Sequence, residues 1–136
     1  MQIFVLDNPM VTAINLDNKR FHNQITEARI ILNCIDGKNK WDKHPLTKMY
    51  WNHRDWLELY IKTLKCYRDN LYDLAQEYSR ESEKVKPEWM NEWFYNIHKS
   101  RLYTKNKSFY KKYSYLGECY SNWYRVDGIW KEYPQK

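Results

Sequence analysis

Apolar side chains recur at helical spacing through much of this 136-residue chain. In the first long segment, from Met10 to Leu32, they follow one another at steps of three, four or seven, the spacing of one helix face. The positions are Val11, Ile14, Phe21, Ile25, Ala28 and Leu32. Asp17 is placed to interrupt and recap this segment, and Gly37 supplies the left-handed residue that ends helices. We therefore expect helical structure from Met10 to about Gly37.

A second long stripe predicts a helix from His53 to about Tyr78. Its apolar members fall mostly at steps of three and four, with charged residues largely between them. They are Trp56, Leu59, Tyr60, Leu64, Tyr67, Leu71 and Leu74. The sequence from Ser79 to Lys86 is polar and predicts a linker that stops at Pro87. Pro87 then opens another predicted helix, which reaches about His98 or Tyr103.

The sequence also predicts the structure of the shorter segments between these helices. Residues 2–6 are mostly apolar but too few for a helix, so we expect an extended arm. Asn8 and Pro9 suit the cap and first position of the helix that follows. Residues 38–44 predict a polar connection, and Pro45 predicts a short helix toward Tyr50.

The end of the chain shows weaker periodicity. Phe109, Tyr110 and Tyr113 indicate one short helical turn, and the sequence beyond Gly117 is irregular and aromatic. Strand signals are nearly absent. We predict an all-α fold: a compact single-domain helical bundle over residues 1–136, with an extended N-terminal arm and an irregular C-terminal segment. This length suits one domain and can bury a core without metals or disulfides.

Positive charge is concentrated near the C-terminus. The net charge is +6, yet residues 1–98 carry 14 Lys or Arg and 14 Asp or Glu. Residues 99–136 carry nine basic and three acidic residues, together with ten of the 24 aromatic residues. Cations hold phosphates and aromatic faces accept unstacked bases. This combination favours nucleic acid over a membrane as the partner, although a solvated basic tail would give the same count.

The sequence lacks the motifs of several other classes of protein and reaction. The number of cysteines is odd, and none of them form a C-x-x-C pair, so we expect a reducing, cytoplasmic environment. The three are Cys34, Cys66 and Cys119. No apolar run approaches a membrane span. The four histidines show no metal-ligand spacing, and phosphate-loop and acyl-transfer motifs are missing. We expect no metal, no cofactor and no membrane contact, and a monomeric chain.

Glu27 is the one carboxylate whose neighbours on the helix indicate a functional role. It shares a helical face with Asn23, four residues earlier, and with Arg20, seven residues earlier. A carboxylate that faces cations and amides can stay ionised and stabilise positive charge. An ordinary surface glutamate has the same local pattern, so composition does not separate the two interpretations.

Ordered motifs add a family resemblance. The segment from His98 to Tyr110 resembles the H-x-S-x-L-x-x-K-(D/N)-x-x-(F/Y)-Y pattern of the pyrimidine-dimer DNA glycosylases, the phage endonuclease V family. The start, from Met1 to Asp7, is similar to a phage branch of that family, as is the His44–Thr47 segment before a Trp-containing helix. The C-terminal aromatic residues, among them Trp123, Tyr124 and Trp130, are similar to the family's ending.

The resemblance implies a DNA glycosylase that excises damaged or modified pyrimidine bases from double-stranded DNA, with an associated AP-lyase step. In that family the N-terminal α-amine attacks C1′ of the damaged nucleotide, the base leaves, and an imine forms before β-elimination. An α-amino group has a reference pKa of about 8, which suits a nucleophile. By matching position the family's catalytic glutamate is Glu27. Because Gln2 is large, we expect Met1 to be retained and to carry the reacting amine.

Distorting a duplex to expose a base costs a few kcal/mol, which contacts to DNA must offset. We expect those contacts from basic and polar residues near Glu27 and the C-terminal motif, with two aromatic residues that wedge or stack. The candidates are Lys19, Arg20, Asn23, His98, Lys99, Arg101, Lys105, Lys107, Trp123 and Tyr124.

Two departures from the family pattern keep a second hypothesis open. Position 2 is Gln rather than a small residue, and position 20 is Arg where relatives often carry His. The alternative is a catalytically inactive phage protein on the same fold that binds nucleic acid, a nucleotide signal or a host protein. We expect its N-terminus to lie away from Glu27. An enzyme acting on a small molecule is a third hypothesis.

Overall fold

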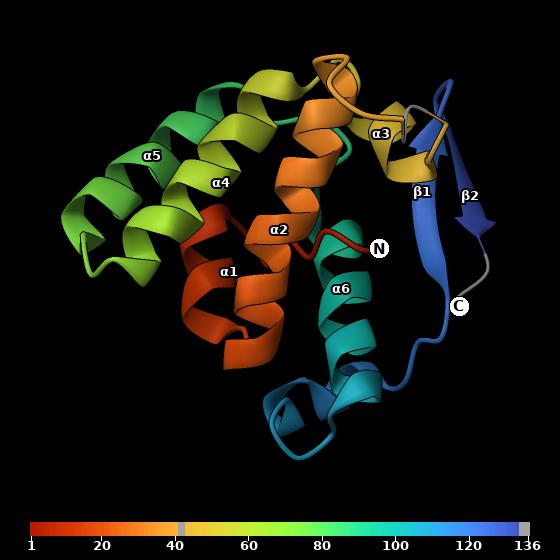
Figure 1. The fold of residues 1–136 in the computed structure, drawn as a ribbon. Coiled ribbons are helices and arrows are strands. Elements are labelled where there is room, and N and C mark those ends of the chain that lie inside the picture. The colour runs from red at the N-terminus through yellow and green to blue at the C-terminus, as the bar shows by residue number, and fades with distance from the viewer. Residues whose placement is uncertain (41–42, 134–136) are drawn as a thin grey trace.

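The computed structural model describes residues 1–40 and 43–133, and most of these lie in helices around an extended N-terminal arm (Figure 1). The elements are α1 (Pro9–Asn15), α2 (Asn18–Ile35), α3 (Pro45–Tyr50), α4 (Arg54–Arg68), α5 (Tyr72–Lys84), α6 (Glu92–Lys105), the 3₁₀ helix η1 (Lys111–Leu116), and strands β1 (Asn122–Val126) and β2 (Ile129–Tyr133). The predicted connection over residues 38–44 includes positions 41–42, which lie outside the described residues.

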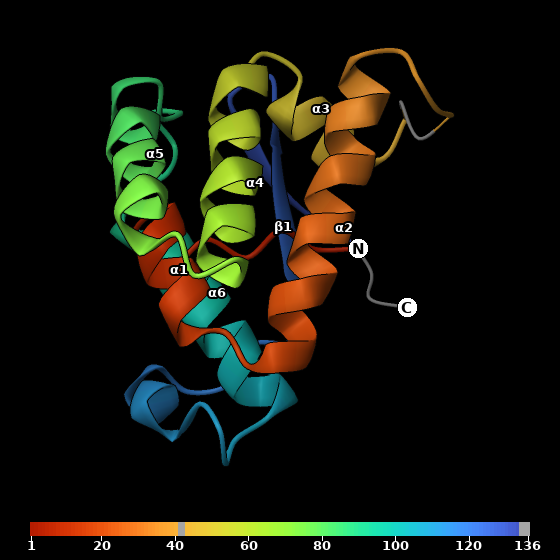
Figure 2. The same ribbon diagram turned by 60° about the vertical axis from the view of Figure 1, so that its left-hand side comes forward.

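The N-terminal arm runs through the centre of the fold, between α2 and α6 (Figures 1 and 2). The side chains of residues 3–6 are all buried in the hydrophobic core. Among residues 1–40 and 43–133 no strand pairs with the arm, so its backbone groups need partners from side chains. Phe4 N–H donates to Gln24 Oε1 at 2.7 Å, and Val5 N–H donates to His98 Nδ1 at 2.8 Å. Long-range side-chain contacts thus hold the arm in place.

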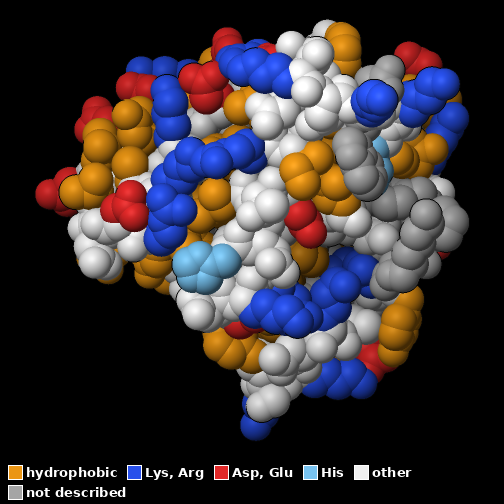
Figure 3. All heavy atoms as spheres, viewed as in Figure 1, with side chains coloured by type: hydrophobic (Ala, Val, Ile, Leu, Met, Phe, Trp, Pro, Cys, Tyr) orange, Lys and Arg blue, Asp and Glu red, His pale blue; other side chains and the backbone are white. Residues whose placement is uncertain are grey.

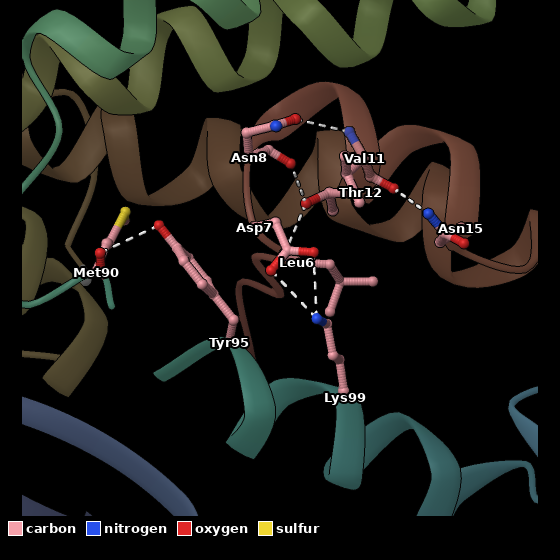
Figure 4. A network of polar contacts seen from close by, with 9 residues as sticks. All are labelled: Leu6, Asp7, Asn8, Val11, Thr12, Asn15, Met90, Tyr95 and Lys99. Carbon is pink, nitrogen blue, oxygen red and sulfur yellow. Dashed lines mark hydrogen bonds and ion pairs between the residues drawn. The ribbon is translucent and has the colours of Figure 1, made fainter. Parts of the chain in front are cut away.

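The turn from the arm into α1 uses local hydrogen bonds (Figure 4). Leu6 N–H donates to Thr12 Oγ1 at 2.8 Å, and Thr12 Oγ1 donates to the Asn8 carbonyl oxygen at 2.8 Å. Asn8 caps α1 by accepting from Val11 N–H at 2.8 Å, and Pro9 takes the first helical position. The extended arm and this cap are both confirmed.

The break predicted at Asp17 is also confirmed. α1 ends at Asn15, and Asp17 caps α2 by accepting from Arg20 N–H at 3.4 Å. α2 ends at Ile35, and Gly37 follows in a left-handed conformation with φ 74°. Buried side chains along α2, such as Phe21, Ile25 and Ala28, form the predicted apolar face.

The single long helix predicted from His53 to Tyr78 is wrong. The chain turns at Asn70, which has φ 62°, and α5 then packs alongside α4 (Figures 1 and 2). Asn adopts the left-handed conformation more readily than most residues, which permits the turn. Leu71 and Leu74 are 52% and 43% exposed, so the predicted stripe does not continue into the core.

The polar linker predicted over residues 79–86 is helical as far as Lys84. α5 buries Ala75, Ser79 and Ser82, which share one face. Ser79 Oγ accepts from Met10 N–H at 3.1 Å, and Ser82 Oγ donates to a carbonyl within the helix. Small polar residues therefore form the packing face, and a search for large apolar residues misses it. α6 begins at Glu92, whereas the sequence predicted that this helix starts at Pro87.

The C-terminal segment contains a β-hairpin, so the prediction of an irregular ending is wrong, whereas the prediction of a mainly helical fold is confirmed. β1 and β2 pair antiparallel, and Val126 lies opposite Ile129. Asp127 and Gly128 form the turn with φ 53° and 78°. Two positive φ angles define the type I′ turn, for which Asp-Gly is a preferred sequence. The structure is mostly helical with this small sheet added.

Tyr60 on α4 links the arm to the core. Its hydroxyl is fully buried and donates to the Phe4 carbonyl oxygen at 2.7 Å. Tyr60→Phe removes this donor and leaves a buried carbonyl unsatisfied, which costs about 1–3 kcal/mol. We expect urea unfolding to show that loss. Tyr115→Phe is the control, because Tyr115 is 74% exposed. Equal stability of both variants would contradict the role of Tyr60.

Candidate active site

Glu27 lies where α2 meets the start of the arm. Its Oε2 accepts from Gln2 N–H at 3.1 Å and lies 3.4 Å from Gln24 Nε2. The Met1 α-amine and Lys105 also interact electrostatically with the carboxylate. The helix brings Gln24 and Glu27 to the same face because they are three residues apart. The two residues predicted to be catalytic, Met1 and Glu27, are therefore brought together.

Burial raises the pKa of Glu27 above the usual value for glutamate. The Gln2 amide, the Met1 α-amine, Lys105 and Gln24 all favour the ionised form, but desolvation is the largest effect. This differs from the expectation that cations and amides keep the carboxylate ionised. A carboxyl group with a raised pKa can exchange protons closer to neutral pH, as an acid–base group must.

Gln24 fixes the first residues of the arm against α2. Its side-chain Oε1 accepts from Phe4 N–H at 2.7 Å, and its Nε2 donates to the Gln2 carbonyl oxygen at 2.8 Å. The amide group thereby hydrogen-bonds to the backbone of the arm as a neighbouring strand does in a sheet. Sequence reasoning missed Gln24, although its position three residues before Glu27 on one helix face was visible.

His98 lies on the other side of the arm, contributed by α6. It is 3% exposed, and its Nδ1 accepts from Val5 N–H at 2.8 Å. Burial lowers the pKa of His98 to about 3, so the ring is neutral. A neutral ring whose Nδ1 accepts carries its proton on Nε2, which lies 3.4 Å from the Gln2 side-chain amide. His98 therefore contacts the arm, although it was predicted to contact DNA.

Three cations of the predicted set are grouped around Lys105. Arg20 and Arg101 both interact with Lys105, and Lys105 interacts with Glu27. Desolvation, with repulsion from the two arginines, lowers the pKa of Lys105. Figure 3 shows this face, where an acidic patch near the centre lies above a band of Lys and Arg side chains. We name Arg20, Arg101 and Lys105 the basic cluster.

Members of the basic cluster differ in their access to a partner. Arg20 forms an ion pair with Asp17 at 3.2 Å and is half-buried. Arg101 is buried, and its Nη1 donates to the Cys119 carbonyl oxygen at 3.1 Å. The Lys105 side chain is exposed at the end of α6, close to the candidate site.

The other predicted basic and polar residues lie further along the surface. Lys99 forms an ion pair with Asp7 at 3.2 Å (Figure 4), and Lys107 forms one with Glu118. Two further candidates on α2, Lys19 and Asn23, are exposed.

The two predicted stacking residues lie on β1. The Trp123 ring contacts Trp93, with centroids 6.0 Å apart, and Trp123 is half-buried. Tyr124 is half-buried and packs against the core. Both side chains therefore have contacts within the protein in addition to an accessible part.

Metal-ligating clusters and membrane-spanning helices are both absent from the described residues. Across residues 1–40 and 43–133, no three His, Cys, Asp or Glu side chains are grouped so that they could hold a metal ion. In the same ranges, no helix has both the length and the apolar character needed to cross a lipid bilayer. Cys34, Cys66 and Cys119 are free thiols.

Comparison with known proteins supports the resemblance seen in the sequence. The family model described as pyrimidine dimer DNA glycosylase matches residues 1–66. The match covers the arm, α1, α2, α3 and most of α4, and it includes Glu27 and Gln24. The similarity to this family is therefore confirmed for that part of the chain. Searches of curated proteins and of solved structures found no significant match.

The buried His98 makes stability depend on pH. Its pKa is about 3 in the folded chain, against 6.5 when unperturbed. As pH falls below 6.5, the unfolded chain binds a proton that the folded chain does not, so folding stability decreases. The limiting slope is about 1.4 kcal/mol per pH unit for one proton. His44 and His53 also have lowered pKa values and act in the same direction.

His98→Asn tests this contribution, because Asn offers an acceptor near the place of Nδ1 and does not titrate. We expect the variant to lose less stability than the parent between about pH 7.5 and about pH 5 in urea unfolding. The same loss in both proteins would show that His98 does not titrate as described.

Proposed function

We propose that this chain is a DNA glycosylase that excises damaged or modified pyrimidine bases and carries an AP-lyase step. The observation that carries the proposal is the contact of the N-terminus with Glu27. The Gln2 N–H lies 3.1 Å from Glu27 Oε2, and the Met1 α-amine interacts electrostatically with the same carboxylate. Both lie within the part of the chain that the glycosylase family model matches.

In the proposed reaction the Met1 α-amine attacks C1′ of the target nucleotide. The bond between C1′ and the base breaks, and the base leaves with the bonding electrons and takes a proton. Loss of the remaining proton from the attacking nitrogen and opening of the sugar give an imine. Removal of a proton from C2′ then expels the 3′ phosphate, which cuts the strand. This sequence needs an amine and one acid–base group.

Glu27 has the properties that this acid–base role requires. Its carboxylate interacts electrostatically with the amine, and we propose that it accepts a proton from the attacking nitrogen and stabilises the cationic sugar. Its raised pKa favours proton exchange nearer to neutral pH. Gln24 and the Gln2 backbone hold the carboxylate in place, which fixes its position relative to the amine.

Lys105, which interacts with Glu27, and its neighbour Arg20 are proposed phosphate contacts, together with the exposed Lys19 and Asn23 on α2. His98 and Arg101 are buried, so we assign them to the protein interior. Lys99 and Lys107 have carboxylate partners and contribute less charge to DNA. Trp123 and Tyr124 remain the candidates for stacking on a displaced base.

The contact between the N-terminus and Glu27 favours an enzyme over the non-catalytic alternative. For an inactive protein on the same fold, we expected an N-terminus away from Glu27. The Coulombic interaction of the α-amine with the carboxylate differs from that expectation.

Glu27→Gln should strongly slow base release and leave the fold intact. Loss of a positioned acid–base group costs about 10²–10⁴-fold in rate. Because the folded-state pKa of Glu27 is raised, its ionised form disfavours folding at neutral pH. The uncharged amide should therefore be at least as stable in thermal unfolding. The exposed Glu77→Gln on α5 serves as the control. Unchanged base release from ultraviolet-irradiated DNA by Glu27→Gln would overturn the proposed role.

Borohydride trapping tests the nucleophile. Reduction of the imine on abasic-site DNA should give a covalent adduct, and mass spectrometry should map it to the Met1 nitrogen. An adduct on Lys105, the other amine beside Glu27, would reassign the nucleophile. No adduct and no base release on any damaged DNA would reject the proposed function.

Lys105→Ala and Lys107→Ala should differ in their effect on DNA binding. The slope of binding affinity against salt falls by about 0.9 for each phosphate that the protein no longer neutralises. We expect this change for Lys105→Ala, and a smaller one for Lys107→Ala because Glu118 partly neutralises Lys107. Fluorescence anisotropy across a salt series measures both slopes. Equal slopes for parent and Lys105→Ala would argue against this role of Lys105.

A further inference from the structure

A second positively charged region lies between α2 and α4, apart from the basic cluster. Two hollows, of about 310 and about 340 Å³, share His22 and Arg68 in their walls. The first hollow is lined by aromatic side chains, among them Phe21 and Tyr67, and the second by Arg29. His22 and Arg68 thus separate two neighbouring depressions in one surface.

Three cations crowd this region. Lys65 interacts electrostatically with Arg29 and Arg68, and desolvation with this repulsion lowers the pKa of Lys65. The nearby acid is Asp69, which forms an exposed ion pair with Arg68 at 3.1 Å. Among the described residues, neither Arg29 nor Lys65 forms an ion pair. We name Arg29, Lys65 and Arg68 the α2–α4 basic groove.

The excess of charge in this groove contrasts with the C-terminal lysines. Lys99 and Lys107 belong to the most basic part of the sequence, yet each has a carboxylate partner. Arg29 and Lys65 belong to the part whose charges cancel in number. Because like charges repel, a bound anion would relieve the crowding of these cations. The fold therefore brings together basic side chains without acidic partners in a part of the sequence whose basic and acidic residues are equal in number.

The groove and the candidate site lie on opposite flanks of α2. Arg29 follows Glu27 by two residues, and residues two apart on a helix leave it in nearly opposite directions. Arg20 and Arg29 are nine positions apart, so they also leave opposite flanks of α2 and are separated by about 13 Å along its axis at the helical rise of 1.5 Å per residue. Figure 3 shows Lys and Arg side chains in separate groups on the face that carries α2.

We propose that the α2–α4 basic groove binds backbone phosphates of the DNA whose target nucleotide lies at Glu27. This inference rests on the proposed function, since it takes DNA as the partner. It adds a second, spatially separate contact on the flank of α2 that faces α4. The ligand chemistry is the phosphodiester, which the arginines and the lysine contact without reading the base.

The test measures DNA affinity across a salt series with a duplex that carries a stable abasic-site analogue. The double variant Arg29→Ala, Lys65→Ala should lower the salt slope by about two, because each phosphate contact contributes about 0.9. Shortening the duplex on one side of the analogue should reduce the affinity of the parent and leave that of the double variant nearly unchanged.

Lys62→Ala is the matched control on the same helix. Lys62 pairs with Glu58 at 3.1 Å and lies over the Tyr78 ring of α5, so it points away from α2. We expect its salt slope to equal that of the parent. Thermal unfolding of each variant shows whether the fold is kept, and Lys65→Gln replaces Lys65→Ala if the double variant is unstable.

The outcomes separate this inference from the proposed function. If the parent binds DNA and releases bases while the groove variants keep the parental slope, the groove does not bind DNA and the proposed function stands. An equal decrease of slope in Lys62→Ala would also reject the groove, since the effect would then follow net charge alone. If the parent binds no DNA, both proposals fail.

Discussion

The fold and the candidate site both depend on hydrogen bonds from side chains to the backbone of the N-terminal arm. The arm is extended and buried, and no strand in the described part of the chain pairs with it, so each buried N–H would otherwise lose its partner on leaving water. Glu27, Gln24, His98 and Thr12 accept from four of these groups. The side chains come from three helices, and the arm therefore orders α1, α2 and α6 around itself.

This arrangement also explains why the candidate acid–base group is half-buried. Glu27 is one of the side chains that hold the arm, so its carboxylate lies against the protein rather than in water. Burial raises its pKa and makes the ionised form less favourable. The contact that orders the N-terminus thus also prepares a group for proton exchange. Stability and the proposed chemistry place opposite demands on the same carboxylate.

Charge along the chain and charge on the surface differ for a physical reason. The C-terminal segment has the larger excess, but Asp7 and Glu118 lie next to two of its lysines. Acids lie near this region as well, yet Asp36, at the C-terminal cap of α2, and Glu58 on α4 both pair with Arg54. The groove cations are therefore left in excess. A surface that binds phosphates is set by which charges face one another.

The sequence by itself determined the local features of the fold. Asn8, Pro9, Asp17 and Gly37 specify helix ends through their own backbone preferences, so these ends were predictable. The Asp127–Gly128 turn was equally local and was missed because the aromatic residues around it obscured the alternation of the strands. The sequence also marked Glu27, through its neighbours and a family resemblance that the comparison confirms over residues 1–66.

Tertiary structure decided the rest. The helical face of α5 consists of Ala75, Ser79 and Ser82, whose small side chains signal packing only when another helix lies against them. The break at Asn70 depends on α5 returning along α4. The burial of His98 and the contact of the N-terminus with Glu27 join residues 25 to 96 positions apart. Periodicity records which face of a helix is apolar, whereas such contacts exist only once the helices have packed.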